Sequence, residues 1–379
     1  MRPAFKLITL PLCGLVVAIG LGEWLVATFA PQPTLAVQMR NSPACGRPSD
    51  LLATELKRSA TCRHVQEEFD VTIHTNSLGY RGPEFAPQKD LSRKRILTVG
   101  DSFTFGHGVN DDETYSAELQ RLFQGKAEVI NGGYASGFSP DAYYLYLKNL
   151  GVQLRPDIVV MGFFIWNDVS DLSETAWPSV DENGLPTRIV SRLRAVDEVG
   201  RFRLVKQGIR HRFIVLRNSH LFQLVYSFRP QLFGPLDLLD SRPGLDPGRE
   251  LASIYTTCLF IDECFFGRYA SEWDKTQQVL IATQDLLRHN GIEFLVVLIP
   301  AKLQFAASET LDQTQQLSVN RRLIEFFEHY GIAYLDLYEA LKKFDLGTVY
   351  YRFDEHWTAK GHAVAGRDIF DYLVARFGA

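Results

Sequence analysis

The order of apolar runs along the chain predicts an α/β fold, a three-layer α/β/α sandwich around a five-stranded parallel sheet. Runs rich in Val, Ile, Leu and Phe alternate with amphipathic stretches, and this alternation is typical of a parallel sheet covered by helices on both faces. The expected strands are residues 95–100, 127–131, 157–164, 292–299 and 332–336. The expected helices are residues 113–124, 140–150, 271–290, 314–330 and 358–377.

The amino-terminal residues predict a membrane anchor. Arg2 and Lys6 precede an apolar segment that carries no charge over residues 7–22 and continues to Ala30. A helix of this length spans a bilayer, and the flanking positive charges face the cytoplasm. Because Pro31 disfavours cleavage after Ala30, we expect an uncleaved signal anchor, with the rest of the chain on the extracytoplasmic side, periplasmic or extracellular.

The chain is predicted to have three parts. Residues 1–31 form the cytoplasmic tip and anchor, residues 32–92 a membrane-proximal segment with few periodic runs, and residues 93–379 a large α/β domain. Residues 169–267 interrupt that domain and are too long for an ordinary connection, so we expect a lid above the strand ends. Within it, residues 201–230 predict a basic amphipathic helix that rests on anionic lipid, lines a groove for an acidic polymer, or packs on the domain with solvated charges.

Four cysteines lie outside the predicted span, and an even number suits an oxidising compartment. They are Cys45, Cys62, Cys258 and Cys264. Pairing Cys45 with Cys62 and Cys258 with Cys264 closes the shortest loops. Four cysteines allow three connectivities, however, and the sequence does not choose among them.

The most informative segment is ILTVGDSFTFG, residues 96–106. Its apolar strand breaks at Gly100, which places Ser102 where the strand ends. In open parallel sheets, reactive groups gather at the carboxyl ends of the strands, where backbone N–H groups and a following helix stabilise negative charge. Ser102 is therefore the candidate nucleophile. A serine that merely caps a helix after a core strand would produce the same short pattern.

The segment Gly100-Asp101-Ser102-Phe103 resembles the first block of the SGNH, or GDSL-type, hydrolases. Three later segments resemble the other blocks of that family in the same order: the glycine-rich bend 131–137, Asn167 after an apolar strand, and YYRFDEHW at 350–357. The resemblance implies a flavodoxin-like sheet, the SGNH-hydrolase fold. It covers residues 95–168 and 292–377 well and residues 1–94 loosely.

The resemblance also implies a role for each block. A serine hydroxyl needs a base, and the base needs a partner that fixes its tautomer. Ser102 would be the nucleophile, His356 the base and Asp354 the carboxylate that orients the base. The oxyanion hole would consist of the Ser102 N–H, the Gly137 N–H and the Asn167 side-chain amide.

Two of these assignments have alternatives. One residue, rather than the commoner two, separates Asp354 from His356, and membrane-linked relatives that include polysaccharide acetyltransferase-like proteins resemble this shorter form. Glu355 therefore remains a substitute for Asp354. Gly137 lies one residue later than in the commoner family spacing, so Gly133 is the second candidate donor.

Two further interpretations involve other histidines. His107 lies in the same loop as Ser102 and is an alternative base, although five residues along a loop rarely aim an imidazole back at a serine. Asp354, His356 and His362 are an alternative set of metal ligands, but the gap between the two histidines matches no helical-face spacing. The sequence carries no phosphate loop and no dinucleotide fingerprint, so we expect neither a metal nor a cofactor.

These observations predict a membrane-anchored serine esterase or O-acyltransferase that acts on O-acyl groups, above all acetyl, of an exported carbohydrate through an acyl-enzyme intermediate. Transfer would require an acyl donor outside the cytoplasm, delivered by a partner membrane protein. The alternatives are a lipase or phospholipase at the membrane surface and a non-catalytic carbohydrate-binding or assembly scaffold of the same fold. A formal charge of −4 and a pI near 6.2 give no reason to expect a nucleic-acid partner.

Overall fold

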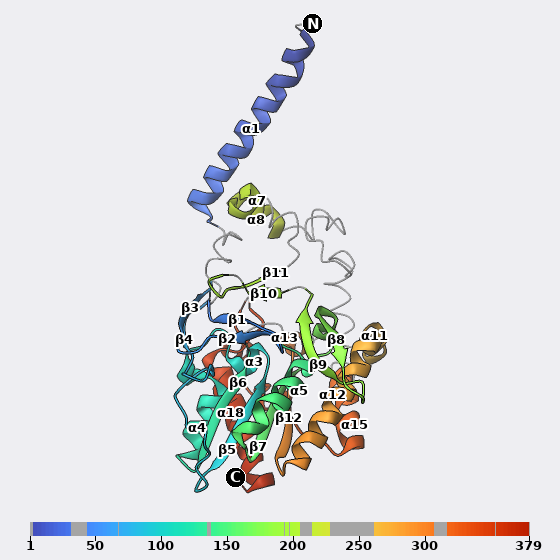
Figure 1. Ribbon diagram of the computed structural model, residues 1–379. Coiled ribbons are helices and arrows are strands. Elements are labelled where there is room, and N and C mark those ends of the chain that lie inside the picture. The colour runs from blue at the N-terminus through green and yellow to red at the C-terminus, as the bar shows by residue number, and fades with distance from the viewer. Residues whose placement is uncertain are drawn as a thin grey trace. The chain divides into compact units, whose positions relative to one another are not determined.

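The structure is a computed structural model of the chain (Figure 1). It describes residues 3–31, 44–66, 68–134, 138–192, 194–196, 198–204, 214–227, 261–306, 317–352 and 354–378. Two compact units can be distinguished: one contains residues 1–41 and 206–255, and the other contains residues 42–205 and 256–379. Each unit is described by itself.

The larger unit is built on the five-stranded parallel sheet that the sequence predicts. Its strand order is β13-β12-β7-β5-β6, and every neighbouring pair is parallel. All residues of β7 are buried, as are all but the first of β5 and β12, which accounts for their continuous apolar runs. The bounds are Lys94–Gly100 (β5), Ala127–Gly133 (β6), Ile158–Phe164 (β7), Glu293–Ile299 (β12) and Ala333–Asp336 (β13).

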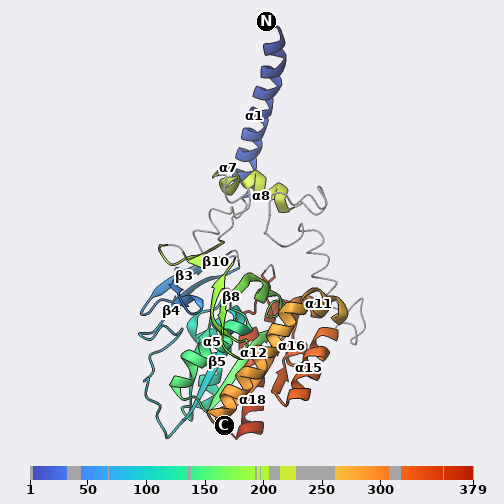
Figure 2. The same ribbon diagram turned by 45° about the vertical axis from the view of Figure 1, so that its right-hand side comes forward.

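Helices cover both faces of this sheet, so the predicted three-layer arrangement is confirmed (Figures 1 and 2). On one face α4 packs against α18, and on the other α5 packs against α12, with α15 following β12. An apolar stripe of α12, with Trp273, Leu280 and Leu287 seven residues apart, is buried. The bounds are Tyr115–Phe123 (α4), Pro140–Asn149 (α5), Ala270–His289 (α12), Ser318–Tyr330 (α15) and Ala359–Phe377 (α18).

The position of β5 inside the sheet determines where a site can form. The chain leaves β5 to form β6 on one side and then returns to form β7 on the other side. The loops that leave the carboxyl ends of β5 and β7 therefore diverge, and this divergence opens a crevice in doubly wound sheets. The short helix α3, Ser102–Phe105, begins at that point.

No strand was predicted within residues 32–92. Two antiparallel hairpins occur there: β1 (Gly46–Ser49) with β2 (Ala53–Leu56), and β3 (Thr61–Val65) with β4 (Asp70–His74). The strands are only four or five residues long, and buried residues alternate with partly exposed ones in β2, β3 and β4. Such short patterns are easily missed in a sequence.

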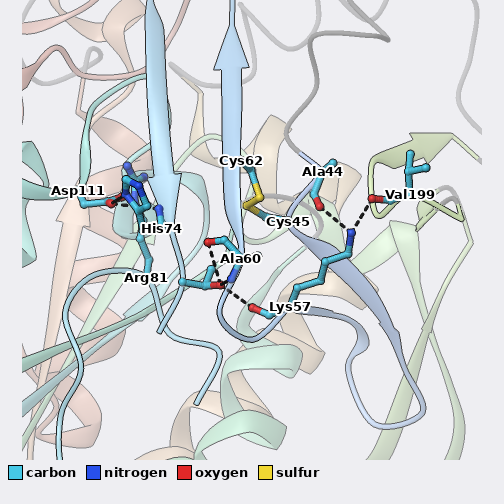
Figure 3. Close-up of a disulfide and its surroundings, with 10 residues drawn as sticks. Ala44, Cys45, Lys57, Ala60, Cys62, His74, Arg81, Asp111 and Val199 are labelled. Atoms are coloured by element: carbon cyan, nitrogen blue, oxygen red, sulfur yellow. Dashed lines mark hydrogen bonds and ion pairs between the residues drawn. A yellow bond between two sulfur atoms is a disulfide. The ribbon is translucent and has the colours of Figure 1, made fainter. Parts of the chain in front are cut away.

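A disulfide joins the two hairpins (Figure 3). Cys45, just before β1, is bonded to Cys62 in β3, so the shortest-loop pairing is confirmed for this pair. Lys57 connects this region to the segment around Val199. Its Nζ donates hydrogen bonds to the carbonyl groups of Ala44 and Val199, at 2.9 and 2.5 Å. Cys264 is also disulfide-bonded. Cys258 lies outside the described residues, so its pairing stays a prediction.

The smaller unit contains the amino-terminal helix α1, Pro3–Phe29, and the helix α8, His220–Ser227, which pack against each other. Glu23 of α1 caps α8: its carboxylate accepts hydrogen bonds from Ser219 Oγ and from the backbone N–H groups of His220 and Leu221. Among the residues that the structure describes, no helix combines the length and apolar character needed to cross a bilayer. The transmembrane span stays a prediction.

The insertion at residues 169–267 is described only in part, so the lid stays a prediction. It begins with an antiparallel hairpin, β8 (Thr175–Val180) with β9 (Pro186–Ser191), in the larger unit. The expectation of one basic helix over 201–230 is wrong, because Phe202–Leu204 is a strand and Ile214–Asn218 (α7) ends before α8 begins. Four basic residues of the range 201–230 lie outside the described residues: Lys206, Arg210, Arg212 and Arg229.

Candidate active site

Ser102 is the first residue of α3, directly after β5. Asp101 caps this helix, because its Oδ1 accepts a hydrogen bond of 2.9 Å from the Phe103 N–H. Two glycines allow the turn: a Cβ at Gly100 would lie 2.1 Å from Thr104 Oγ1, and a Cβ at Gly133 would lie 2.2 Å from the Phe105 nitrogen. Their missing side chains let the backbone of α3 pack directly on the ends of β5 and β6.

The structure brings Ser102, His356 and Asp354 together, although the serine and the histidine are 254 residues apart in the sequence. His356 Nε2 lies 2.7 Å from Ser102 Oγ, and His356 Nδ1 lies 2.5 Å from Asp354 Oδ1. The same Asp354 oxygen accepts the His356 backbone N–H at 2.9 Å. A proton on Nδ1 therefore points at the carboxylate, which leaves the Nε2 lone pair directed at the serine hydroxyl.

Asp354, and not Glu355, contacts the imidazole. Burial alone would raise the pKa of Asp354, but hydrogen bonds from His107 and His356 outweigh burial and hold this pKa well below its usual range. Burial raises the pKa of Glu355. An ionised Asp354 is the form that can stabilise an imidazolium.

His107 is not placed as a base toward Ser102. Its ring stacks on His356, with 4.1 Å between ring centroids and 23° between planes, and its Nε2 is 3.6 Å from Asp354 Oδ2. Phe103 lies 4.8 Å from the His356 ring at a tilt of 33°. Two rings thus pack against the imidazole that faces the serine.

The predicted oxyanion donors are placed only in part. Gly137 lies outside the described residues. The backbone N–H of Gly133, the second candidate, donates to Asn131 Oδ1 at 2.9 Å and so is already used within β6. Asn167 lies in the turn after β7, the strand beside β5, and its Nδ2 donates to Asp171 Oδ2 at 3.1 Å.

Sequence reasoning missed the contribution of the hairpin formed by β3 and β4. Glu68, in its turn, accepts hydrogen bonds from the backbone N–H groups of Arg352 (2.5 Å) and Asp354 (2.8 Å). Phe69 packs near Tyr351 and His107, each with 5.4 Å between ring centroids. The alternating pattern of this hairpin was available in the sequence. Its contact with a loop 286 residues away was not.

Arg81 supports the loop that follows Ser102. It is buried, and its guanidinium donates hydrogen bonds to Asp111 and to three backbone carbonyl groups, those of Phe105, Gly106 and Val109. Figure 3 shows Arg81 beside His74 and Asp111. Arg81 therefore stabilises the loop that leads away from Ser102.

The predicted metal ligands do not come together as a set. His362 is buried in α18, where its Nδ1 accepts the Tyr115 N–H at 3.3 Å. In the described part of the chain, His107, Asp354 and His356 do place ligand atoms within 4.8 Å of one another. Imidazole lone pairs lie in the ring plane, however, and these two rings are stacked, so a metal between them would lie out of both planes.

Part of the chain matches a known protein family. Residues 259–377 match the family model described as "SGNH hydrolase-like domain, acetyltransferase AlgX". No curated protein matches the sequence.

The chain is also similar to solved structures at low sequence identity. A lipolytic protein of the G-D-S-L family from Desulfitobacterium hafniense DCB-2 is 13% identical over 74% of this chain and 99% of that one, with a TM-score of 0.37. A lipase/acylhydrolase from Enterococcus faecalis is 12% identical over 75% and 96%, with a TM-score of 0.37. A variant of the acetyl-xylooligosaccharide esterase Axe2 from Geobacillus Stearmophilus is 13% identical over 75% and 95%, with a TM-score of 0.39. The matched family model lies over the part of the chain that carries His356 and Asp354, and it is the finding that supports the resemblance to SGNH/GDSL-type hydrolases.

Proposed function

We propose that this protein is a serine-dependent esterase or O-acyltransferase. The observation that carries the proposal is the continuous path from Ser102 Oγ to His356 Nε2, 2.7 Å, and from His356 Nδ1 to Asp354 Oδ1, 2.5 Å. Such a path is what makes a neutral hydroxyl nucleophilic. Acyl esterase or acetyltransferase activity in general is also what the matched family model supports.

In the first half of the reaction, Ser102 Oγ attacks the acyl carbonyl carbon while His356 Nε2 accepts the hydroxyl proton. The new imidazolium is stabilised by Asp354. Collapse of the tetrahedral intermediate expels the alcohol, which takes the proton back from Nε2, and leaves the acyl group on Ser102. In the second half, water or an acceptor hydroxyl gives its proton to His356 Nε2 and attacks the acyl-enzyme. Collapse of the second tetrahedral intermediate releases the carboxylic acid or the new ester, and Ser102 Oγ takes the proton back from Nε2.

The negative charge on the carbonyl oxygen needs donors. The Ser102 N–H, at the first turn of α3, is one of them in this proposal. Asn167 is another, and donation to the oxyanion requires its amide to turn from Asp171. Gly137 is the third.

The substrate we propose is an O-acylated, above all O-acetylated, exported carbohydrate. The family model is described by an acetyltransferase, which favours acetyl among acyl groups. The disulfide between Cys45 and Cys62 favours an oxidising, extracytoplasmic compartment. In this proposal α1 anchors the chain in a membrane, where a partner protein supplies the acyl donor if the reaction is transfer.

Two experiments test the proposal in sequence. A serine-reactive fluorophosphonate should label the full-length protein at Ser102, and a Ser102→Ala variant should remain unlabelled. Protein that has not been treated with the label is then assayed for acetate release from acetylated xylo-oligosaccharides and for fatty-acid release from phospholipid vesicles. Fatty-acid release alone would assign a lipase instead. Absence of labelling in folded protein would leave a non-catalytic scaffold and overturn the enzyme assignment.

A further inference from the structure

We propose that His107 is a positioning residue for His356: it holds the second carboxylate oxygen of Asp354 and covers one face of the imidazole. The inference rests on the function proposed above, in which His356 is the base. In this role His107 acts through Asp354 and His356 rather than on the substrate.

Two contacts carry the inference. The planes of the His107 and His356 rings lie 23° apart, with centroids 4.1 Å apart. His107 Nε2 is 3.6 Å from Asp354 Oδ2, whereas His356 Nδ1 is 2.5 Å from Asp354 Oδ1. One carboxylate therefore faces two imidazoles, one through each oxygen. Rotation of that carboxylate would weaken both contacts at once, so the pair of imidazoles fixes its plane.

His107 is itself held by the hairpin formed by β3 and β4. The His64 ring meets it edge-on at 4.7 Å between centroids, and the Phe69 ring lies at 5.4 Å. A ring enclosed in this way has few alternative rotamers, and it can therefore transmit its position to its neighbours.

The charge state of His107 suits this role. Burial, and next the charge of His356, lower the pKa of His107 to about 4, against the opposing effect of Asp354. The other titratable groups that act on it or pack against it are Arg81, which also lowers its pKa, and His64, whose own pKa burial lowers to about 3. A neutral ring can cover the imidazolium that His356 becomes, whereas a second cation at this distance would oppose that charge.

The role predicts a specific effect on His356. A proton on His107 Nε2 shares the negative charge of Asp354. Without that donor, the full charge acts on His356 and should raise its pKa. His107→Phe removes the donor and keeps an aromatic face, so it isolates this effect. His107→Gln keeps a donor and removes the ring. Its effect on the titration of His356 should therefore be smaller than that of His107→Phe.

The experiment is a titration of the His356 ring by 15N NMR in the full chain, with His356→Ala used to assign the signal. We expect the ring nitrogens of His356 to titrate at a higher pH in His107→Phe than in the natural protein, and His107→Gln to fall between the two. His289→Phe, at an exposed histidine of α12, is the control and should leave the value unchanged. An unchanged His356 pKa in His107→Phe that unfolds cooperatively would overturn the inference.

Kinetics give a second measurement. With an activated acetyl ester, His107→Phe should lower kcat about threefold to tenfold, leave KM nearly unchanged, and move the acid limb of kcat/KM to higher pH. The NMR titration does not require turnover. The two tests are therefore independent. Failure of fluorophosphonate labelling would overturn the proposed function. An unchanged titration of His356 would overturn the positioning role of His107.

Discussion

The carboxylate of Glu68 accepts the backbone N–H of Asp354 at 2.8 Å, so a hairpin that precedes the catalytic sheet holds the turn that carries the candidate base. The other oxygen of Glu68 accepts the N–H of Arg352 at 2.5 Å. Charge-assisted hydrogen bonds of this kind fix a backbone more firmly than neutral ones. The candidate site is therefore completed by residues outside the part that resembles the family blocks.

Glu68→Ala should lower kcat about tenfold with little change in KM, because the Asp354–His356 turn loses both acceptors while the substrate loses nothing. Glu68→Gln keeps one acceptor oxygen, so its kcat should lie between that of Glu68→Ala and that of the natural protein. Steady-state kinetics with an activated acetyl ester measure the effect. Glu182→Ala, at an exposed position after β8, is the matched control. Equal activity of Glu68→Ala and the control would show that the hairpin does not position the turn.

Ser102→Ala and His356→Ala should each abolish turnover, and the double variant should be no worse than either single one. The serine and histidine act as one unit, so their effects on the barrier do not add. Initial rates measured for all three variants, with circular dichroism to confirm folding, test this. If Ser102→Ala keeps more than about a tenth of the activity, Ser102 is not the nucleophile.

Asp354→Asn should lower kcat strongly, by about a thousandfold or more, because the amide cannot stabilise the imidazolium and permits the wrong histidine tautomer. Glu355→Gln serves as its neighbouring control and should keep nearly full activity. Both are measured with the same soluble ester. The reverse pattern, an impaired Glu355→Gln and a normal Asp354→Asn, would reassign the orienting carboxylate.

Gly133→Ala should remove activity and destabilise the domain by about 2 kcal/mol or more, because its Cβ would lie 2.2 Å from the Phe105 nitrogen and push α3 from β6. Gly267→Ala is the control, since a Cβ there meets nothing within 4 Å and its helix should tolerate alanine. Urea denaturation and initial rates measure the two effects. Activity retained in Gly133→Ala would mean that α3 can shift without displacing Ser102.

The stability of the protein should fall as the pH falls below about 6.5. Burial lowers the pKa of His64 and of His362 to about 3, and that of His107 to about 4. Because these values lie below that of an unfolded histidine, the unfolded chain binds more protons between pH 6.5 and the folded pKa values, and acid favours unfolding. Each buried histidine contributes a slope of about 1.4 kcal/mol per pH unit in this window.

Urea denaturation at about pH 7.5 and about pH 5.5 measures this slope. His362→Gln should lose about 1 kcal/mol less than the natural protein between the two pH values, although it is less stable at both. The depressed pKa of Asp354 does not act in this window, because its contribution is lost only below the usual carboxyl range. An identical acid slope in the variant and the natural protein would contradict a neutral His362 in the folded state.

The sequence by itself determined the central sheet and the order of the candidate residues along it. Apolar runs identified all five parallel strands. The signal is clearest for β5, β7 and β12, because a strand buried on both faces leaves no room for polar alternation. The break at Gly100 placed Ser102 at a strand end, since only a residue without a side chain fits beside Thr104 there. The spacing around His356 left two alternatives, Asp354 and Glu355, for the carboxylate that orients this histidine.

Only the tertiary structure decided which side chains meet. The choice of Asp354, the stacking of His107 on His356, and the contact from Glu68 all depend on segments far apart in the sequence. The short hairpins of residues 46–74 escaped detection because strands of four or five residues carry little periodic signal. A local pattern reports which face of an element is buried, but the partner that buries it is set by packing over the whole chain.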